Sequence, residues 1–192
     1  MAKNPIYTIG YGNRSIEEFI KLLQQYEIQY LVDVRSHPYS RFNPDFSKAV
    51  LEKRLRQSGI GYMFMGGTLG GRPNDDTCYE NGKVKYEKVN EKPFYQESIK
   101  RLQIAFEKQF RVALMCSEMK PQECHRAKLI GNTLVQWHID VAHIDETGEA
   151  KTQEMINNLL KEGQLSLFGE PPLLNDKVGF SRKKYTSSSE RT

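Results

Sequence analysis

The feature that most constrains the fold is the alternation of short apolar runs with amphipathic segments. Apolar runs predict strands at residues 6–9, 30–34, 62–65, 111–115 and 141–144, of which 111–115 is the clearest. Apolar residues at helical spacing predict helices at about 16–26, 47–57, 92–108, 121–137 and 152–161. Strands that alternate with helices imply βαβ units. We therefore predict a single α/β domain with a mostly parallel sheet flanked by helices, followed by a flexible C-terminal tail.

Local signals set the boundaries of several elements. Ser15 and Glu18 have the spacing of a capping box at the start of the first helix. In the helix at 47–57, Val50, Leu51 and Leu55 are expected to face inward. Residues 66–90 are Gly-rich and polar and show no period, which predicts a long, mobile loop.

Composition indicates the domain boundary and the compartment. The chain divides into a domain at 1–161 and a tail at 162–192, where Gly, Pro, Ser and charged residues dominate. No apolar run approaches the roughly 18 residues of a membrane span, and there is no signal-peptide pattern. Three cysteines are not a disulfide framework, so we expect a reducing, cytoplasmic location. A net charge of +4 permits nucleic-acid partners without indicating them.

Residues 116–126, which read CSEMKPQECHR, carry the strongest chemical signal. Cys116 stands where a strand ends. If Pro121 is the first residue of the next helix, Cys124 lies in its first turn, where the helix dipole stabilises a thiolate. Such a cysteine acts as a nucleophile, with Glu118 or His125 moving protons. The alternative is that these cysteines are buried core residues.

A metal site is another interpretation of this segment. Cys116, Cys124 and His125 would bind zinc or iron, although their spacing differs from that of a standard zinc ribbon or finger. A fourth ligand would come from Glu118, Asp33 or His143. A lone His on an apolar strand is, however, more often a core residue, and this applies to His143.

A carboxylate and several arginines are expected near the cysteines, because the carboxyl ends of parallel strands share one sheet edge. Asp33 interrupts an apolar strand and needs a partner, which Arg35, Arg41 or Arg126 would supply. Asp33 is then either half of a structural ion pair, or a group that orients a neighbour or acts as a general acid or base. Five arginines are expected to converge here and to bind phosphate: Arg14, Arg35, Arg41, Arg72 and Arg126. Residues 66–72 could also cradle phosphate, but they lack the Walker and Rossmann patterns.

Several stretches in order resemble the domain of unknown function 488 (DUF488) family. They are residues 8–15, 32–36, 40–44, 69–72, 116–118, 124–126 and 141–144, which together span roughly residues 5–145. The resemblance implies a small α/β fold and supports the site, but it names no substrate. Tyr11-Gly12 stands where many relatives have a His-Ser-type pair, so a role for that His does not carry over.

The tail contains a sequence similar to the bacterial sliding-clamp-binding pentapeptide. Its residues are Gln164, Leu165, Ser166, Leu167 and Phe168. Apolar anchors in a polar segment suggest binding to a groove on a partner. The alternative is that the segment packs against its own domain.

Three functions follow from these features. The first is an enzyme, a hydrolase or lyase that uses Cys or a metal, acting on DNA or a nucleotide and tethered to the clamp for replication or repair. The second is a non-catalytic DNA-binding or adaptor module. The third is a small-molecule thiol enzyme of rhodanese-like character. The substrate, the reaction, the metal and the oligomeric state are not given by the sequence.

Overall fold

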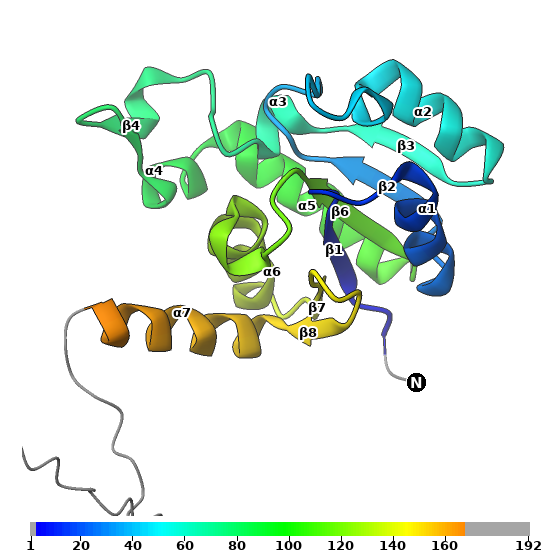
Figure 1. Ribbon diagram of the computed structural model, residues 1–192. Helices are drawn as coiled ribbons and strands as arrows, with labels where there is room; N and C mark the ends of the chain where they lie inside the picture. Colours follow the sequence, from blue (N-terminus) through cyan, green and yellow to red (C-terminus); the bar gives the residue numbers. More distant parts are fainter. Residues whose placement is uncertain (1–2, 168–192) are drawn as a thin grey trace, which may run out of the picture.

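A six-stranded sheet forms the centre of the computed structural model, which describes residues 3–167 (Figure 1). Its strands are β1 (Ile6–Gly10), β2 (Tyr30–Asp33), β3 (Gly61–Phe64), β6 (Val112–Cys116), β7 (Val141–Ile144) and β8 (Ala150–Thr152). They lie in the order β3-β2-β6-β1-β7-β8, and only the β7–β8 pair is antiparallel. The predicted α/β fold with a mostly parallel sheet is confirmed. The edge strand β8 was not predicted.

Helices cover both faces of the sheet, because successive side chains of a strand point to opposite faces. Leu31 packs in one core with Phe19 of α1 (Ile16–Gln25) and with α2 (Lys48–Gln57). Val32 packs in the other with Leu102 of α5 (Pro93–Glu107) and with the helices that follow β6. All five residues of β6 are buried, which places this strand in the interior of the sheet.

Two details of the helices test the local signals. The capping box predicted at Ser15 and Glu18 is present, with both reciprocal hydrogen bonds. The inward orientation predicted for Val50 is wrong, since its side chain is 40% exposed. The buried stripe of α2 consists of Leu51 and Leu55, four residues apart, and position 50 is rotated about 100° from Leu51.

The long loop expected at residues 66–90 is also wrong. The segment forms α3 (Gly66–Leu69), the 3₁₀ turn η2 (Asp76–Cys78), the hairpin β4 (Tyr79–Glu80) and β5 (Lys83–Val84), and α4 (Tyr86–Asn90). These elements are too short to produce a sequence period. Leu69, Cys78 and Val89 anchor them in the same core as α5. Together β4, β5 and α4 project beside the sheet (Figure 1).

The single helix expected at 121–137 consists of three pieces. They are the 3₁₀ turn η3 (Pro121–Glu123), the π-helix η4 (Arg126–Gly131) and α6 (Asn132–Gln136). Gln153 Nε2 donates a hydrogen bond to the Ala127 carbonyl at 3.3 Å, a group that an α-helix would use internally. Widened turns of this kind are frequent at functional sites.

The last helix is longer than expected. α7 (Gln153–Leu167) continues past Lys161, where we expected the tail to begin. The backbone at 164–167 therefore belongs to α7, whereas Phe168 and the rest of the predicted tail lie outside the described residues. Within residues 3–167, none of the helices is long and apolar enough to cross a membrane.

The topology defines one place where ligands are expected. From β1 the chain runs through α1 on one face to β2, and from β6 it runs through η4 and α6 on the other face to β7. β1 and β6 are neighbours, so their connections leave in opposite directions. In open α/β sheets, ligands bind in the crevice outside the carboxyl ends of such strands.

Candidate active site

Cys116 lies at this crevice, at the carboxyl end of β6 and beside Gly10 of β1. The chain after β6 folds closely over β1. A Cβ on Gly10 would lie 1.9 Å from the Glu118 carbonyl oxygen and 2.6 Å from Arg126 Nη1. Only glycine leaves room for this approach, which returns Glu118 to a position next to Cys116.

The structure brings together four side chains that the sequence singled out. Glu118 Oε2 lies 2.8 Å from Cys116 Sγ and 3.2 Å from Cys124 Sγ. His125 Nδ1 lies 3.8 Å from Cys116 Sγ and 3.6 Å from Cys124 Sγ. The cysteines and the histidine are buried, whereas Glu118 is exposed at the edge of the group. We call these four residues the thiol cluster.

A backbone carbonyl fixes the orientation of His125. Its Nε2 lies 3.1 Å from the Val34 carbonyl oxygen, which only accepts hydrogen bonds. Nε2 therefore donates to this carbonyl, and Nδ1 faces the two sulfur atoms. Gly71 packs against the other side of the group, since a Cβ there would lie 3.0 Å from His125 Cγ.

The two thiols differ in acidity. The hydrogen bond with Cys124 and the neighbouring His125 hold the pKa of Cys116 well below its usual range, against the opposing effect of burial. The hydrogen bond with Cys116 and burial raise the pKa of Cys124. Burial would raise the pKa of Glu118, but hydrogen bonds from both thiols lower it. Without a ligand, Cys116 is therefore the sulfur that ionises first.

The position expected for Cys124 in the first turn of a helix is wrong. Its backbone is extended, with φ −111° and ψ 148°, because η3 ends before it. Its sulfur instead accepts a long hydrogen bond from the Arg126 amide at 3.5 Å. Cys124 thus precedes the helix and is held by it, without being part of it.

Asp33 forms a buried ion pair with Arg35. The Asp33 carboxylate accepts from Arg35 Nε at 2.9 Å and Nη2 at 2.7 Å, and from the Tyr62 hydroxyl at 2.8 Å. The geometry therefore supports both the ion pair and the orienting role for Asp33, and it gives no support to a role as general acid or base. With the carboxylate fully engaged, Asp33 orients Arg35 instead of facing the thiol cluster.

Arg35 is held with one nitrogen free. Its side chain is 5% exposed and stacks over the Tyr11 ring, with 5.2 Å between the guanidinium carbon and the ring centroid. Nη1 is buried and has no hydrogen-bond partner among the described residues. A buried donor without a partner costs about 1–3 kcal/mol, so a ligand that accepts from it would relieve a penalty already present.

The expected convergence of five arginines is wrong for three of them. Arg35 and Arg72 line the pocket described next. Arg14 is buried and donates to the backbone carbonyls of Gly10 and Asp145. Arg126 is 0% exposed, while Arg41 is exposed and does not line this pocket. Each of these three lies on a different segment around the same sheet edge, and strand-end loops turn side chains in several directions.

Arg126 has a structural task. Its Nη1 and Nη2 donate to the carbonyls of Glu118 and Met119 at 2.7 and 2.8 Å. Arg126 therefore anchors the turn that places Glu118 against the cysteines. It supports the thiol cluster from behind and does not face a ligand.

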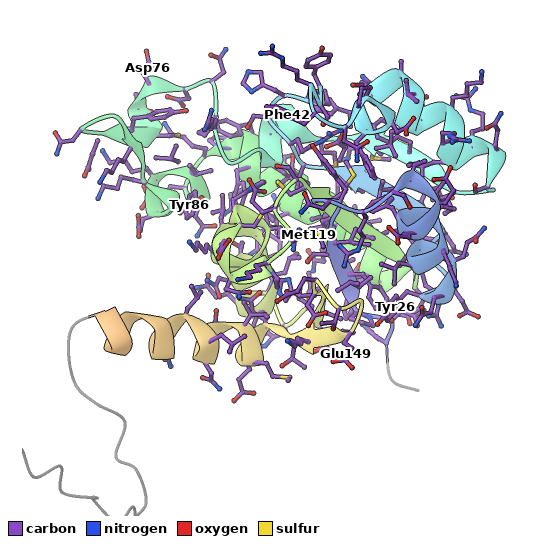
Figure 2. The ribbon with its side chains drawn as sticks, viewed as in Figure 1. Tyr26, Phe42, Asp76, Tyr86, Met119 and Glu149 are labelled. Atoms are coloured by element: carbon purple, nitrogen blue, oxygen red, sulfur yellow. The ribbon has the colours of Figure 1, made fainter. Side chains whose placement is uncertain are left out.

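A pocket of about 370 Å³ opens over the thiol cluster. All four residues of the cluster line it, together with Arg35 and Arg72. Its other walls include Tyr11, Ser36, His37, Tyr39, Gly71 and Tyr86. Tyr86 belongs to the α4 projection (Figure 2), whereas Ser117 and Glu118 belong to the chain after β6, so two segments far apart in the sequence line the pocket. The aromatic walls were not predicted from the sequence, because tyrosines carry no spacing signal of their own.

Two of the alternative metal ligands are excluded by their contacts. Asp33 is engaged by Arg35 and Tyr62. His143 is a core residue, as expected, with Nδ1 at 2.8 Å from Thr8 Oγ1 and Nε2 at 2.7 Å from Gln153 Oε1. Glu118 is the remaining candidate. The expected glycine-rich loop at 66–72 is largely α3, and its contribution to the pocket is Gly71 and Arg72.

Fold and site define an α/β protein with a thiol- and arginine-lined pocket at the carboxyl edge of a parallel sheet. The family model described as "Domain of unknown function DUF488" matches residues 15–132, more than half of the chain. The chain therefore belongs to the DUF488 family. No curated protein and no solved structure matches it. The matched range contains the whole thiol cluster, whereas Tyr11 and His143 lie outside it.

Proposed function

We propose that this chain is an enzyme that acts on a phosphate-bearing substrate, a nucleotide or a nucleic-acid end. The observation that carries the proposal is Arg35, which lines the same pocket as the thiol cluster and whose buried Nη1 has no hydrogen-bond partner among the described residues. Asp33 holds the guanidinium in place, so Arg35 is oriented before a ligand arrives. Arginine presents fixed donors that match phosphate oxygens.

Arg72 supplies the second positive charge. It lines the pocket and is exposed, and its backbone amide donates to Ser36 Oγ at 3.0 Å, beside Arg35. A fixed buried arginine and a mobile exposed one together suit a dianionic phosphate better than a single carboxylate. We infer that Arg35 fixes the position of the phosphate and that Arg72 closes over it.

Aromatic side chains favour a nucleotide over a simple phosphorylated metabolite. Tyr11, Tyr39 and Tyr86 line the pocket, and Tyr39 is 72% exposed. Phe42, on the same connection as Tyr39, is 98% exposed. Exposed aromatic rings beside arginines are the usual platform for stacked bases, worth about 1–3 kcal/mol per base.

The reactive groups would be those of the thiol cluster. Cys116 is the candidate nucleophile, or a metal ligand, and Glu118 is the group at the pocket that accepts and donates protons. Either mode is compatible with a hydrolase or a lyase. Loss of turnover in Cys116→Ala and Glu118→Gln would support an enzyme, whereas unchanged biological activity in both would favour a non-catalytic DNA-binding module.

The test is equilibrium binding of nucleoside monophosphates and short single-stranded DNA to the full chain at low salt. We expect Arg72→Ala to weaken binding at least about tenfold, as the loss of a charge-assisted hydrogen bond implies. The matched control is Arg56→Ala, an exposed arginine of α2 that pairs with Glu52 and does not line the pocket. Equal affinity in wild type, Arg72→Ala and Arg56→Ala would contradict the proposal, as would no binding at all.

A role at replication or repair sites is a finer proposal that rests on sequence alone. It is supported by residues 164–168 and by no side-chain contact in the described residues. We expect the full chain to bind a bacterial sliding clamp and Leu167→Ala/Phe168→Ala to abolish that binding without changing nucleotide affinity. The free thiols Cys78, Cys116 and Cys124 fit the reducing cytoplasm in which such a partner would be met.

A further inference from the structure

The thiol cluster has the composition and spacing of an ion-binding site. The Sγ atoms of Cys116 and Cys124 and Nδ1 of His125 all lie within 4.8 Å of one another. They come from the end of β6 and from the two residues before η4, so the sheet and a helix hold them independently. Such a group does not depend on one mobile loop.

The distances match a tetrahedral site. With metal–sulfur bonds of about 2.3 Å and metal–nitrogen bonds of about 2.0–2.1 Å, a tetrahedron has a sulfur–nitrogen edge of about 3.6 Å. The observed separations from His125 Nδ1 are 3.6 Å to Cys124 Sγ and 3.8 Å to Cys116 Sγ.

The second contact of His125 is the one that metal-binding histidines make. Metal-ligating histidines almost always donate their other ring N–H to a carbonyl, a carboxylate or water. Here Nε2 donates to the Val34 carbonyl at 3.1 Å, and Nδ1 is aimed between the thiols.

We propose that Cys116, Cys124 and His125 bind one zinc ion, with the fourth position facing the pocket beside Glu118. Two sulfurs and one imidazole select zinc over magnesium, calcium or manganese, which prefer oxygen ligands. Three protein ligands with an accessible fourth position are the pattern of catalytic zinc sites. The inference rests on the proposed function and deepens it, because it assigns the metal to the reactive group.

The charges of the cluster agree with this assignment. Both sulfurs approach the same Glu118 oxygen, at 2.8 and 3.2 Å, so three groups that can each carry a negative charge meet at one point. A divalent ion would neutralise two thiolates at this point. The sulfur–oxygen edge of a tetrahedral site is about 3.5 Å, so Glu118 would withdraw by several tenths of an ångström when the ion enters.

The experiment is metal analysis of the full chain, purified without a tag and without added chelator. We expect about one zinc per chain, and at least about a tenfold loss of bound zinc in Cys116→Ala, Cys124→Ala and His125→Asn. Cys78→Ala and His138→Asn are the matched controls, since Cys78 lies in η2 and His138 is exposed beyond α6. Both controls should keep the full zinc content.

A second measurement uses the wild-type chain, so it tests the metal site even if the variants fail to fold. Cobalt replacing zinc in the wild-type chain should give thiolate-to-cobalt charge-transfer absorption, and a chelator should make two further thiols reactive. Two results would overturn the metal site. One is a metal-free chain that binds neither zinc nor cobalt. The other is rapid reaction of Cys116 with an alkylating agent before any chelator is added. Arg72-dependent nucleotide binding without metal would leave the proposed function standing, whereas bound zinc without nucleotide binding would leave only the metal site.

Discussion

The buried pair of Asp33 and Arg35 gives the sharpest test of the proposed phosphate position. The Asp33 carboxylate accepts three hydrogen bonds from Arg35, counting its backbone amide at 3.1 Å, and one from Tyr62. Both side chains of the pair are at most 5% exposed. Asp33→Ala would therefore leave a guanidinium buried without its counter-ion.

The expected cost follows from this burial. Breaking a buried pair by removing one partner costs about 3–5 kcal/mol, whereas an exposed pair contributes about 0–1 kcal/mol. Urea unfolding should show that loss for Asp33→Ala, with Glu17→Ala as the exposed control, because Glu17 pairs with Arg54 at the surface. Tyr62→Phe removes one hydrogen bond to the carboxylate and should cost about 1.5–3 kcal/mol.

A double variant separates the charge from the packing. Asp33→Ala combined with Arg35→Met removes both charges, so it should be more stable than Asp33→Ala alone. Both variants should lose nucleotide affinity, because neither presents an oriented Nη1. If Asp33→Ala costs no more than Glu17→Ala, Asp33 does not hold Arg35 and the reasoning fails.

Three further perturbations test separate parts of the structure. Burial between Thr8 and Gln153 lowers the pKa of His143 to about 4, below its unfolded value of about 6.5, so the neutral ring stabilises the fold above pH 6.5. That contribution, up to about 3 kcal/mol, should disappear as the pH falls toward 4, and the pH dependence of unfolding should be flatter in His143→Gln. Gly10→Ala should lower the free energy of unfolding by about 1–3 kcal/mol, because its Cβ would meet the Glu118 carbonyl. At Gly67 a Cβ meets nothing within 4 Å, so Gly67→Ala should be neutral or stabilising by up to about 1 kcal/mol. Thermal melts compare the two variants. Arg126→Met leaves the carbonyls of Glu118 and Met119 without their donors. It should lower the free energy of unfolding in urea by about 2–3 kcal/mol. A loss below about 0.5 kcal/mol would show that Arg126 does not anchor the turn after β6.

The order of strands and helices could be predicted from the sequence because the signals for these elements are local and periodic. The run before Cys116 and the capping box at Ser15 are sufficient to place a central strand and the first helix. Those signals also placed Asp33, Cys116 and Cys124 at one sheet edge, since carboxyl ends of parallel strands coincide. Elements of two to five residues, such as β4, β5 and α4, leave no such period and were missed.

The direction of side chains was the part that the sequence could not provide. Arg14, Arg35 and Arg126 all belong to strand-end segments, yet only Arg35 lines the pocket. Arg126 instead donates to the carbonyls of Glu118 and Met119 in the turn after β6, and Arg14 donates to those of Gly10 and Asp145. Such choices depend on the three-dimensional course of neighbouring loops, and the same is true of Tyr86, which reaches the pocket from a separate projection.

The most direct measurement is a crystal structure of the full chain with a nucleoside monophosphate. We predict that the phosphate lies over the thiol cluster, with one oxygen within hydrogen-bond distance of Arg35 Nη1 and another near Arg72. Density for the nucleotide elsewhere, for example between α1 and the turn at Gly148, with Arg35 Nη1 still unpaired, would contradict it.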